Sequence, residues 1–328
     1  MADYISIRRR RALKLLAALA AARYPVVALA RYPDRAVRLI VPGGAGASTD
    51  AVARIVQLHA QEALGQSLIV DNRAGAGGVV GTLEAVRSPP DGYTLLVASL
   101  GTHVLRQLLV SDTGFDTLRD LSPITKLVDV PGIILAAPDL PVRNLGELIA
   151  LARASSRPLA YGTPGIGTSA HLIAELLCAR TGIKLLQVPY SNSPRSYADL
   201  TAGRIPLAFS LVTGVQGQVM SGRMKAIAVT SARRVRSLPQ VPTVEESGIR
   251  DFDVTSWYGV MAPAGTPAPV LERAHKAFAR TLHLADVEDR LANIGASAVG
   301  NTPAAFKAQI EADFKRWAAV IRDANIHL

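Results

Sequence analysis

The sequence predicts an α/β fold with two mainly parallel sheets flanked by helices. Short apolar stretches alternate along the chain with amphipathic segments of helical length, as 38–41 does with 49–64 and 133–137 with 144–154. This alternation is typical of βαβ units, in which helices join neighbouring parallel strands. The turns that lead from strand to helix are rich in Gly, Ser and Thr.

The expected elements form two series of similar size. In the first, strands are expected at 38–41, 67–71 and 94–98, with a helix at 49–64. In the second, strands are expected at 133–137, 159–161, 185–188, 205–209 and 226–230, with a helix at 144–154. An extended run at 254–262 and helices at roughly 269–282 and 303–323 follow. The 144–154 helix starts like a capping box, and Thr302–Pro303 is a favourable helix start.

The order of these series predicts two domains, one inserted into the other. The last two helices have no strand series of their own, so we expect them to pack back onto the first unit. Domain 1 is then discontinuous, with residues 31–131 and 255–328, and domain 2 comprises 132–254. Two chain crossings, near 128–132 and 250–256, are expected to form a hinge.

Composition excludes several classes of protein. The 328 residues are 49% hydrophobic and 19% charged, which argues against extensive disorder, and no uncharged apolar run reaches 18 residues. Beyond residue 30 the chain carries 30 basic and 25 acidic side chains. This small excess of basic side chains is not clustered, so it does not indicate nucleic-acid binding, but it suits weak attraction of anionic solutes. The single cysteine, Cys178, lies on an apolar helical face and is expected to pack in the core.

Residues 1–30 resemble a secretory signal peptide. Arg8–Arg11 form a basic head, 15–22 an apolar middle, and Ala28-Leu29-Ala30 a small-residue exit. Cleavage after Ala22 or after Ala30 would fit this pattern. The run of arginines also resembles a weak twin-arginine signal, so both the general and the twin-arginine export routes stay open.

The stretch "YGTPGIGTSAHL" at 161–172 points to an anion site. A strand leads into it and a helix follows, with Thr168 or Ser169 as the N-cap. The first turn of a helix has unpaired N–H groups and a partial positive charge, and the glycines allow a ligand to approach the backbone. The stretch lacks the lysine of a phosphate loop, the glycine order of a dinucleotide fingerprint and the second glycine of a nucleophile elbow. A carboxylate fits best.

Similar loops follow other expected strands. They are "VPGGAGASTDAVAR" at 41–54, "NRAGAGG" at 72–78 and "ASLGTH" at 98–103. In open parallel sheets, ligands bind beyond the carboxyl ends of the strands. We therefore expect these loops to converge on one cleft between the two domains.

Taken together, these motifs resemble those of the Bug proteins, periplasmic solute-binding receptors related to the tripartite tricarboxylate transporter. The resemblance covers residues 31–328 and rests on the order and spacing of "YPDRAVRLIVPGGAGASTDAVAR", "NRAGAGG", "PDGYTLL", "YGTPGIGTSAHL", "VPY", "AVTSARR", "VPTVEESG", "TSWYGVMAPAGTP" and "IGASAVG". It implies a two-lobed periplasmic-binding-protein type II fold with a hinged cleft. It also implies a periplasmic location, a small carboxylate ligand, membrane permease subunits as partners, no catalysis and no cofactor. A monomer is expected.

The resemblance also implies which residues contact the ligand, through backbone N–H groups and hydroxyls. The first loop supplies Gly46, Ala47, Ser48 and Thr49; the 98–103 loop supplies Ser99, Gly101 and Thr102; the middle loop supplies Thr163, Gly167, Thr168 and Ser169. His171 and Ser210 complete this set of candidate residues.

Two positions depart from the family pattern. Gly43 stands where an aromatic residue usually follows Val-Pro, which is expected to widen that wall of the cleft. Phe209-Ser210 replaces a Phe-Asp pair whose acid can meet an amino or hydroxyl group of the ligand. Because that carboxylate is missing, a plain or hydroxylated carboxylic acid is favoured over a ligand with a cationic amino group.

Two alternative functions stay open. A hydrolase would use His103 or His171 with Ser99, Ser169 or Asp50, but no spacing assembles a nucleophile, a base and an orienting acid. Asp50 is more simply placed to favour the helix dipole. A receptor that presents its ligand to a signalling protein is the second alternative. No metal is expected, because no histidine pair has His-x-x-x-His spacing.

Overall fold

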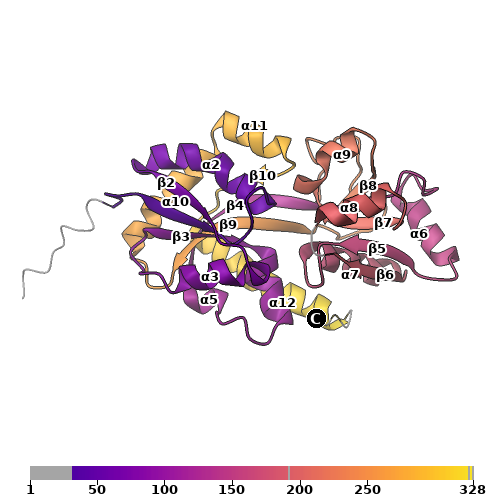
Figure 1. Ribbon diagram of the computed structural model, residues 1–328, viewed down its shortest axis with the longest axis horizontal. Coiled ribbons are helices and arrows are strands. Elements are labelled where there is room, and N and C mark those ends of the chain that lie inside the picture. The colour runs from indigo at the N-terminus through magenta and orange to yellow at the C-terminus, as the bar shows by residue number, and fades with distance from the viewer. Residues whose placement is uncertain (1–31, 191–192, 324–325, 327–328) are drawn as a thin grey trace, which may run out of the picture.

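The computed structural model describes residues 32–190, 193–323 and 326. The predicted signal peptide at 1–30 lies outside these residues. Figure 1 shows two lobes joined by two long strands that run from one lobe into the other. The fold class is confirmed as α/β, with helices on both faces of each sheet.

The first lobe is built on strands from both ends of the described chain. They are β1 (Val37–Val41), β2 (Leu68–Asn72), β3 (Thr94–Ser99), β9 (Thr255–Pro263), the first part of β4 (Leu121–Ala136) and the short β10 (Ser297–Ala298). β1 pairs in parallel with β2 and β3, whereas β9 lies antiparallel between β3 and β4. β10 pairs with β4 at the far edge.

The second lobe has a sheet of its own. It contains the last part of β4 with β5 (Leu159–Thr163), β6 (Leu185–Pro189), β7 (Leu207–Leu211) and β8 (Lys225–Val229). β5 is parallel to β6 and β7, and β4 is antiparallel to β7 and β8.

Both sheets are therefore mixed rather than mainly parallel. The chain leaves the first lobe on β4, a single 16-residue strand, and returns on β9, so these two strands pair antiparallel over 121–131. The parallel pairs are confined to strands that helices connect. Sequence periodicity detected the parallel units but could not reveal that one strand serves both sheets.

Helices cover both faces of the first sheet (Figure 1). One face carries α2 (Ser48–Leu64), α10 (Ala268–Leu282) and α11 (Ala285–Asn293), and the other α3 (Val79–Val86), α5 (Thr117–Asp120) and α12 (Pro303–Asp323). The short turns η2 (Ala76–Gly78) and η3 (Gly101–Leu105) lead into α3 and α4 (Arg106–Leu109). α11 is a helix that the sequence analysis did not anticipate. Valines and alanines of α2 share one apolar core with Phe278 and Leu291.

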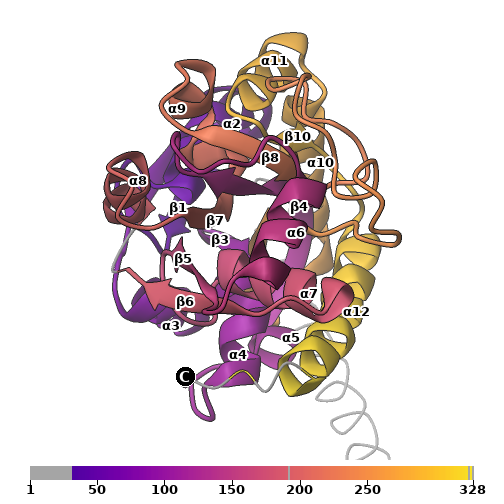
Figure 2. The same cartoon turned by 90° about the vertical axis from the view of Figure 1, so that its right-hand side faces the viewer.

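The second sheet is also covered on two sides (Figure 2). One side carries α6 (Leu145–Ala154) and α7 (Ser169–Thr181), and the other α8 (Ser193–Thr201), η4 (Val212–Gly214) and α9 (Gln216–Met220). α12 lies on the same side as α7, and a continuous core joins Phe306 and Trp317 of α12 to Leu172 of α7. The N–H of the buried Trp257 ring donates to Asp313 of α12 at 2.8 Å. This helix therefore contacts both lobes.

One side chain ties the two crossings together. Thr230 Oγ1 accepts the N–H of Gly132 at 2.8 Å and donates to the carbonyl of Val254 at 2.5 Å. A Cβ on Gly132 would lie 2.4 Å from Ile173 Cδ1, so only glycine fits there without displacement. The division into domains 31–131 with 255–328 and 132–254 stays a prediction.

Candidate functional site

A cavity of about 780 Å³ lies between the lobes. Its walls come from the α2 start, the segment after β3, the α7 start, α8, the end of β7 and β9. Among the residues expected from the sequence, the lining includes Gly46, Ala47, Ser48, Thr49, Ser99, Gly101, Thr102, Gly167, Thr168, Ser169 and Ser210. The predicted loops thus converge on one cavity, and ligand contact by these residues stays a prediction.

Two of the expected residues lie behind the lining. Thr163 is fully buried at the end of β5, where its hydroxyl accepts the side-chain N–H of Gln187 at 2.9 Å. The His171 ring faces its own loop and helix, because Nδ1 accepts the N–H of Gly167 at 3.0 Å and Nε2 lies 3.6 Å from Glu175 Oε1. Both side chains support the loop that lines the cavity.

The start of α2 offers its N–H groups to the cavity. Its N-cap is Ala47, with extended φ/ψ angles and no side-chain cap. By helix geometry, the N–H groups of Ser48, Thr49 and Asp50 have no intrahelical partner. The aligned peptide dipoles add partial positive charge at the same point. This end of α2 is therefore a donor site for an anion.

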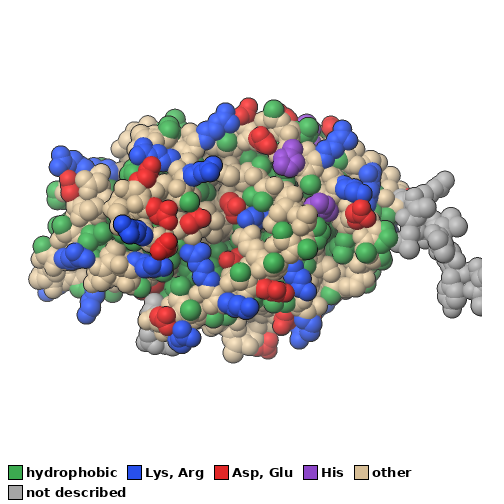
Figure 3. Space-filling model, turned by 180° about the vertical axis from the view of Figure 1, so that it is seen from behind, with side chains coloured by type: hydrophobic (Ala, Val, Ile, Leu, Met, Phe, Trp, Pro, Cys, Tyr) green, Lys and Arg blue, Asp and Glu red, His purple; other side chains and the backbone are tan. Residues whose placement is uncertain are grey.

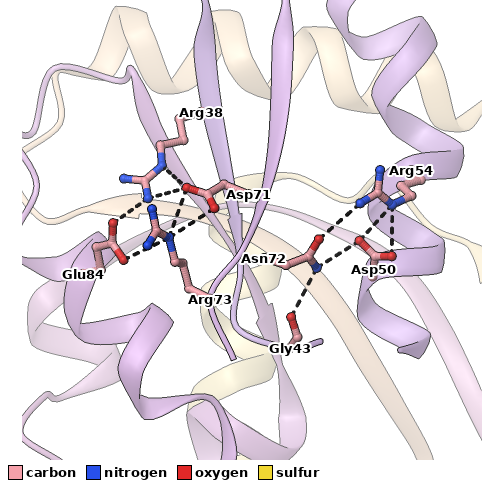
Figure 4. A network of polar contacts seen from close by, with 8 residues as sticks. All are labelled: Arg38, Gly43, Asp50, Arg54, Asp71, Asn72, Arg73 and Glu84. Carbon is pink, nitrogen blue, oxygen red and sulfur yellow. Dashed lines mark hydrogen bonds and ion pairs between the residues drawn. The ribbon is translucent and has the colours of Figure 1, made fainter. Parts of the chain in front are cut away.

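Asp50 holds the α2 start in place (Figure 4). Its Oδ2 accepts the N–H of Gly46 at 2.8 Å, and Arg54 and Asn72 donate to the same carboxylate at 3.0 Å. Asn72 also donates to the carbonyl of Gly43 at 3.2 Å. Burial raises the pKa of Asp50, but these hydrogen bonds outweigh burial and hold the pKa below its usual value. Asp50 is thus a charged scaffold beneath the loop.

A second polar network lies beside the first (Figure 4). Arg38 of β1 pairs with Asp71 of β2 and Glu84 of α3, and Arg73 also contacts both acids. Hydrogen bonds and charge from Arg38 outweigh burial and lower the pKa of Asp71. These half-exposed pairs join three elements of the first lobe.

The start of α7 is partly satisfied by its own side chains. Thr168 is the N-cap, as one of the two sequence alternatives predicted: its Oγ1 accepts the N–H of His171 at 3.4 Å and donates to the carbonyl of Gly165 at 2.8 Å. The N–H of Gly167 is bound by the His171 ring. Among the first N–H groups of α7, those of Ser169 and Ala170 are not bound by the Thr168 cap.

His103 supports the segment after β3, which forms one wall of the cavity. Its Nδ1 accepts the N–H of Ser99 at 3.1 Å, and its Nε2 lies 3.3 Å from Thr82 Oγ1. Complete burial lowers the pKa of His103 to about 4, so the ring is neutral at pH 7. Thr102 hydrogen-bonds Ser99 through its N–H and Gly77 through its hydroxyl. The imidazole therefore fixes a loop rather than reaching the cavity.

Hydroxyl groups connect the two lobes around the cavity. Thr213 Oγ1 donates to Ser48 Oγ at 3.1 Å, and Ser169 Oγ donates to Ser256 Oγ of β9 at 3.4 Å. On the second lobe, the hydroxyls of Tyr197 and Ser210 are hydrogen-bonded to each other. The cavity wall is thus rich in small polar groups.

Arg106 is a charged lining residue that sequence reasoning missed. It follows Thr102 by four residues, a spacing that places two side chains on one helical face. Within the part of the chain that the structure describes, it is the only charged residue of the lining, which holds no Asp or Glu. The spacing from Thr102 could have suggested it, although nothing in the sequence identifies its tertiary neighbours.

Catalytic arrangements are not assembled among the described residues. Each candidate imidazole accepts a backbone N–H rather than a serine hydroxyl, and Ser169 contacts Ser256. Burial raises the pKa of Cys178 to about 12, which leaves its thiol unreactive. No group of three or more His, Cys, Asp or Glu side chains within 32–190 and 193–323 could hold a metal ion.

The face opposite to that of Figure 1 carries charges of both signs. Figure 3 shows blue and red side chains interspersed over this face rather than gathered in one basic stripe. Among the helices that the structure describes, none is both long enough and apolar enough to span a bilayer.

Two α/β lobes joined by crossing strands, with a cavity between helix starts that holds serine and threonine hydroxyls, define a solute-binding protein. The family model of the tripartite tricarboxylate transporter family receptor matches residues 52–326, and the chain belongs to that family. The resemblance to Bug proteins is thereby confirmed. The family and its solved structures are periplasmic solute-binding receptors, not enzymes.

Individual relatives agree with this assignment. Protein BugT of Bordetella pertussis is 35% identical over 298 residues, covering 90% of this chain and 91% of the relative. The structure of periplasmic binding protein BugD is similar with a TM-score of 0.79 and 34% identity, covering 90% of this chain and 99% of BugD. The structure of R. palustris Rpa4515 with adipate gives a TM-score of 0.83 and 32% identity, with coverages of 90% and 99%.

Proposed function

We propose that this protein is an exported receptor that captures a small carboxylate between its lobes and delivers it to the permease of a tripartite tricarboxylate-type transporter. The observation that carries the proposal is that the starts of α2 and α7, one in each lobe, border the same cavity. Unpaired N–H groups and helix dipoles favour an anion at both starts.

The remaining lining supports an anion over a cation, and similar proteins support a carboxylate as that anion. Serine and threonine hydroxyls surround the helix starts, and they can donate to a carboxylate oxygen. Ser210, with no acid beside it in the described lining, offers no counter-charge for an amino group. Two similar proteins support the ligand class: R. palustris Rpa4515 has a structure with adipate, and R. palustris MatC one with bound malate.

Capture proceeds by closure of the lobes. We assign residues 31–131 with 255–328 to one moving body and 132–254 to the other, with the crossings at 128–132 and 250–256 as the hinge. Since a carboxylate bound to both helix starts interacts with both lobes only when they are close together, it has higher affinity for the closed form. Closure is thus a consequence of differential affinity.

Location and partners follow from the family rather than from the cavity. Export directed by residues 1–30 would bring the receptor to the periplasm, where permease subunits accept the loaded form. A monomer suffices for this cycle, because both helix starts belong to one chain.

A thermal-shift screen of the dialysed mature protein tests the proposal. The panel contains monocarboxylates, dicarboxylates, hydroxy acids, amino acids, sugars and nucleotides, with confirmation by calorimetric titration. A carboxylate at one hundred times its Kd is expected to stabilise the protein by about 2.7 kcal/mol. Stabilisation by sugars or nucleotides alone would contradict the proposal.

A further inference from the structure

Arg106 stands apart from the other charged residues around the cavity because no group in the described part of the chain neutralises its charge. Its Nε is buried and has no hydrogen-bond partner, and its side chain forms no ion pair among the described residues. By contrast, Arg54 beneath the neighbouring loop pairs with Asp50. A guanidinium has five N–H donors, and an unpaired one in a partly desolvated position is unfavourable unless a ligand supplies the acceptor.

The backbone around Arg106 is shaped to hold the guanidinium close. Gly77 has a φ of +64°, and a Cβ there would lie 2.7 Å from Nη1 of Arg106. The carbonyl of Gly77 is already an acceptor for Thr102 Oγ1, at 3.1 Å. The guanidinium therefore packs against the turn at Gly77, whose carbonyl already accepts the Thr102 hydroxyl. In this it differs from a surface arginine that is surrounded by water.

The position of Arg106 differs from that of the helix starts. Gly101 faces the α7 start, since a Cβ on it would lie 3.9 Å from Ser169 Oγ. The Cα atom of Arg106 lies about one helical turn beyond that of Thr102, roughly 5 Å along the axis, and its guanidinium lies beside Gly77. Leu109, which lines the same cavity, follows after another three residues. One anionic group at the helix starts thus leaves the guanidinium available for a second.

We propose that Arg106 binds a second carboxylate of the ligand and makes this receptor selective for dicarboxylates over monocarboxylates. This inference rests on the proposed function, which places the first carboxylate at the helix starts. A guanidinium can bind a carboxylate through two parallel N–H donors, a stronger contact than one between neutral groups. A monocarboxylate leaves the guanidinium unpaired, whereas a dicarboxylate neutralises it.

Calorimetric titration with matched acids tests the assignment. The probes are pairs of equal carbon number, succinate with butyrate and adipate with hexanoate. The proteins are the wild type, Arg106→Gln, Arg106→Lys and the control Arg223→Gln. Arg223 is exposed and lines a neighbouring surface hollow on the second lobe, but it is not part of the main cavity lining, so its replacement makes the same charge change outside that lining.

The wild type and Arg223→Gln are expected to prefer the diacid of at least one pair by about tenfold or more. Arg106→Gln is expected to lose about 10- to 100-fold of diacid affinity while monoacid affinity changes less than about threefold, and Arg106→Lys to lose less. Thermal unfolding of the unliganded variants reports on the fold, and Arg106→Gln is expected to unfold no earlier than the wild type.

The outcomes separate this inference from the proposed function. If the wild type binds monoacids as tightly as diacids, or if Arg106→Gln weakens both classes equally, the role of Arg106 is refuted while the carboxylate receptor stands. A loss of diacid affinity in Arg223→Gln equal to that in Arg106→Gln also refutes it. A wild type that binds neither class contradicts the proposed function as well.

Discussion

The two helix starts at the cavity are satisfied in different ways. At the α7 start, the hydroxyl of Thr168 accepts the N–H of His171, and the His171 ring accepts the N–H of Gly167. At the α2 start, the N-cap is Ala47, whose side chain cannot accept a hydrogen bond, and among the backbone N–H groups of this loop Asp50 binds that of Gly46. The first lobe therefore presents more free donors than the second.

This difference suggests an order of events in ligand capture. An anion entering the open cleft meets its strongest unoccupied donors at α2, where a natural capping residue is missing. Under the proposed function, the α7 start, which its own side chains already cap, completes the site when the lobes close. A helix without a capping side chain is less stable. The α2 start therefore has lower stability but keeps its N–H donors free for a ligand.

The largest effect is expected when the missing cap is supplied. In Ala47→Asp the new carboxylate would bind the α2 N–H groups and repel a ligand, so affinity is expected to fall at least about 100-fold. The unliganded protein is expected to gain about 1 kcal/mol of unfolding free energy, because the backbone at 47 already has N-cap geometry. Titration calorimetry and chemical denaturation measure the two quantities.

Ala47→Asn is the matched control, since it supplies a cap without a charge. It is expected to show a similar gain in stability with a smaller loss of affinity. Wild-type affinity in Ala47→Asp would mean that the α2 start does not contact the ligand.

Removal of the Thr168 cap tests the start of α7. Thr168→Val loses the hydrogen bond to the N–H of His171 and the one to Gly165, so the unfolding free energy is expected to fall by about 1 kcal/mol. Affinity is expected to fall about fivefold or more, because the α7 start is no longer held in place. Thr168→Ser should restore both; unchanged stability and affinity in Thr168→Val would contradict the capping role.

His103, which supports the loop after β3, allows a pH test. His103 has a pKa of about 4 in the folded protein because it is buried, against about 6.5 in the unfolded chain. Between these values the unfolded chain binds a proton that the folded protein does not, so stability falls as pH decreases from about 6.5 to 4 and is unaffected above 6.5. The expected loss is about 1 kcal/mol at pH 5.5.

Calorimetric melting of the wild type and His103→Gln between pH 7.5 and pH 4.5 measures this contribution. The variant is expected to have a lower melting temperature at pH 7.5 but a flatter pH dependence. Parallel curves for the two proteins would show that His103 does not cause the decline.

The smallest effect is expected at the hydroxyl contact between the lobes. Thr213→Val removes the hydrogen bond to Ser48 Oγ, which exists only when the lobes are close together. Affinity is expected to fall about two- to threefold with the unfolding free energy nearly unchanged. Small-angle scattering of the liganded variant should show a larger open fraction, and tighter binding would contradict a role in closure.

Local patterns in the sequence predicted much of this architecture. The strand-to-helix loops and the Thr168 cap follow from glycine placement and capping preference, which are both local. The long β4 strand could not be predicted, because its register in two sheets depends on residues far apart in the chain. The helix at 285–293 could not be predicted from periodicity, because its apolar face is short and buries only Val287 and Leu291.

The side-chain partners at the site were beyond sequence reasoning. His171 sits beside the expected loop in sequence, but its ring turns toward Gly167 and Glu175 because they offer a donor and a charge within reach. Arg106 lies outside the glycine-rich motif, and only the folded turn at Gly77 brings it to the cavity. The sequence motifs therefore predicted which segments form the cavity wall, but not the direction in which each side chain points.

The central claim is that both helix starts bind one carboxylate together. Nitrogen-15 NMR during titration with a carboxylate from the screen tests it directly, through the amide resonances of Ser48 and Thr49 in α2 and of Ser169 and Ala170 in α7. Both pairs of resonances are expected to shift and to saturate with the same Kd. Shifts confined to one helix start, or saturation of the two starts at different ligand concentrations, would contradict it.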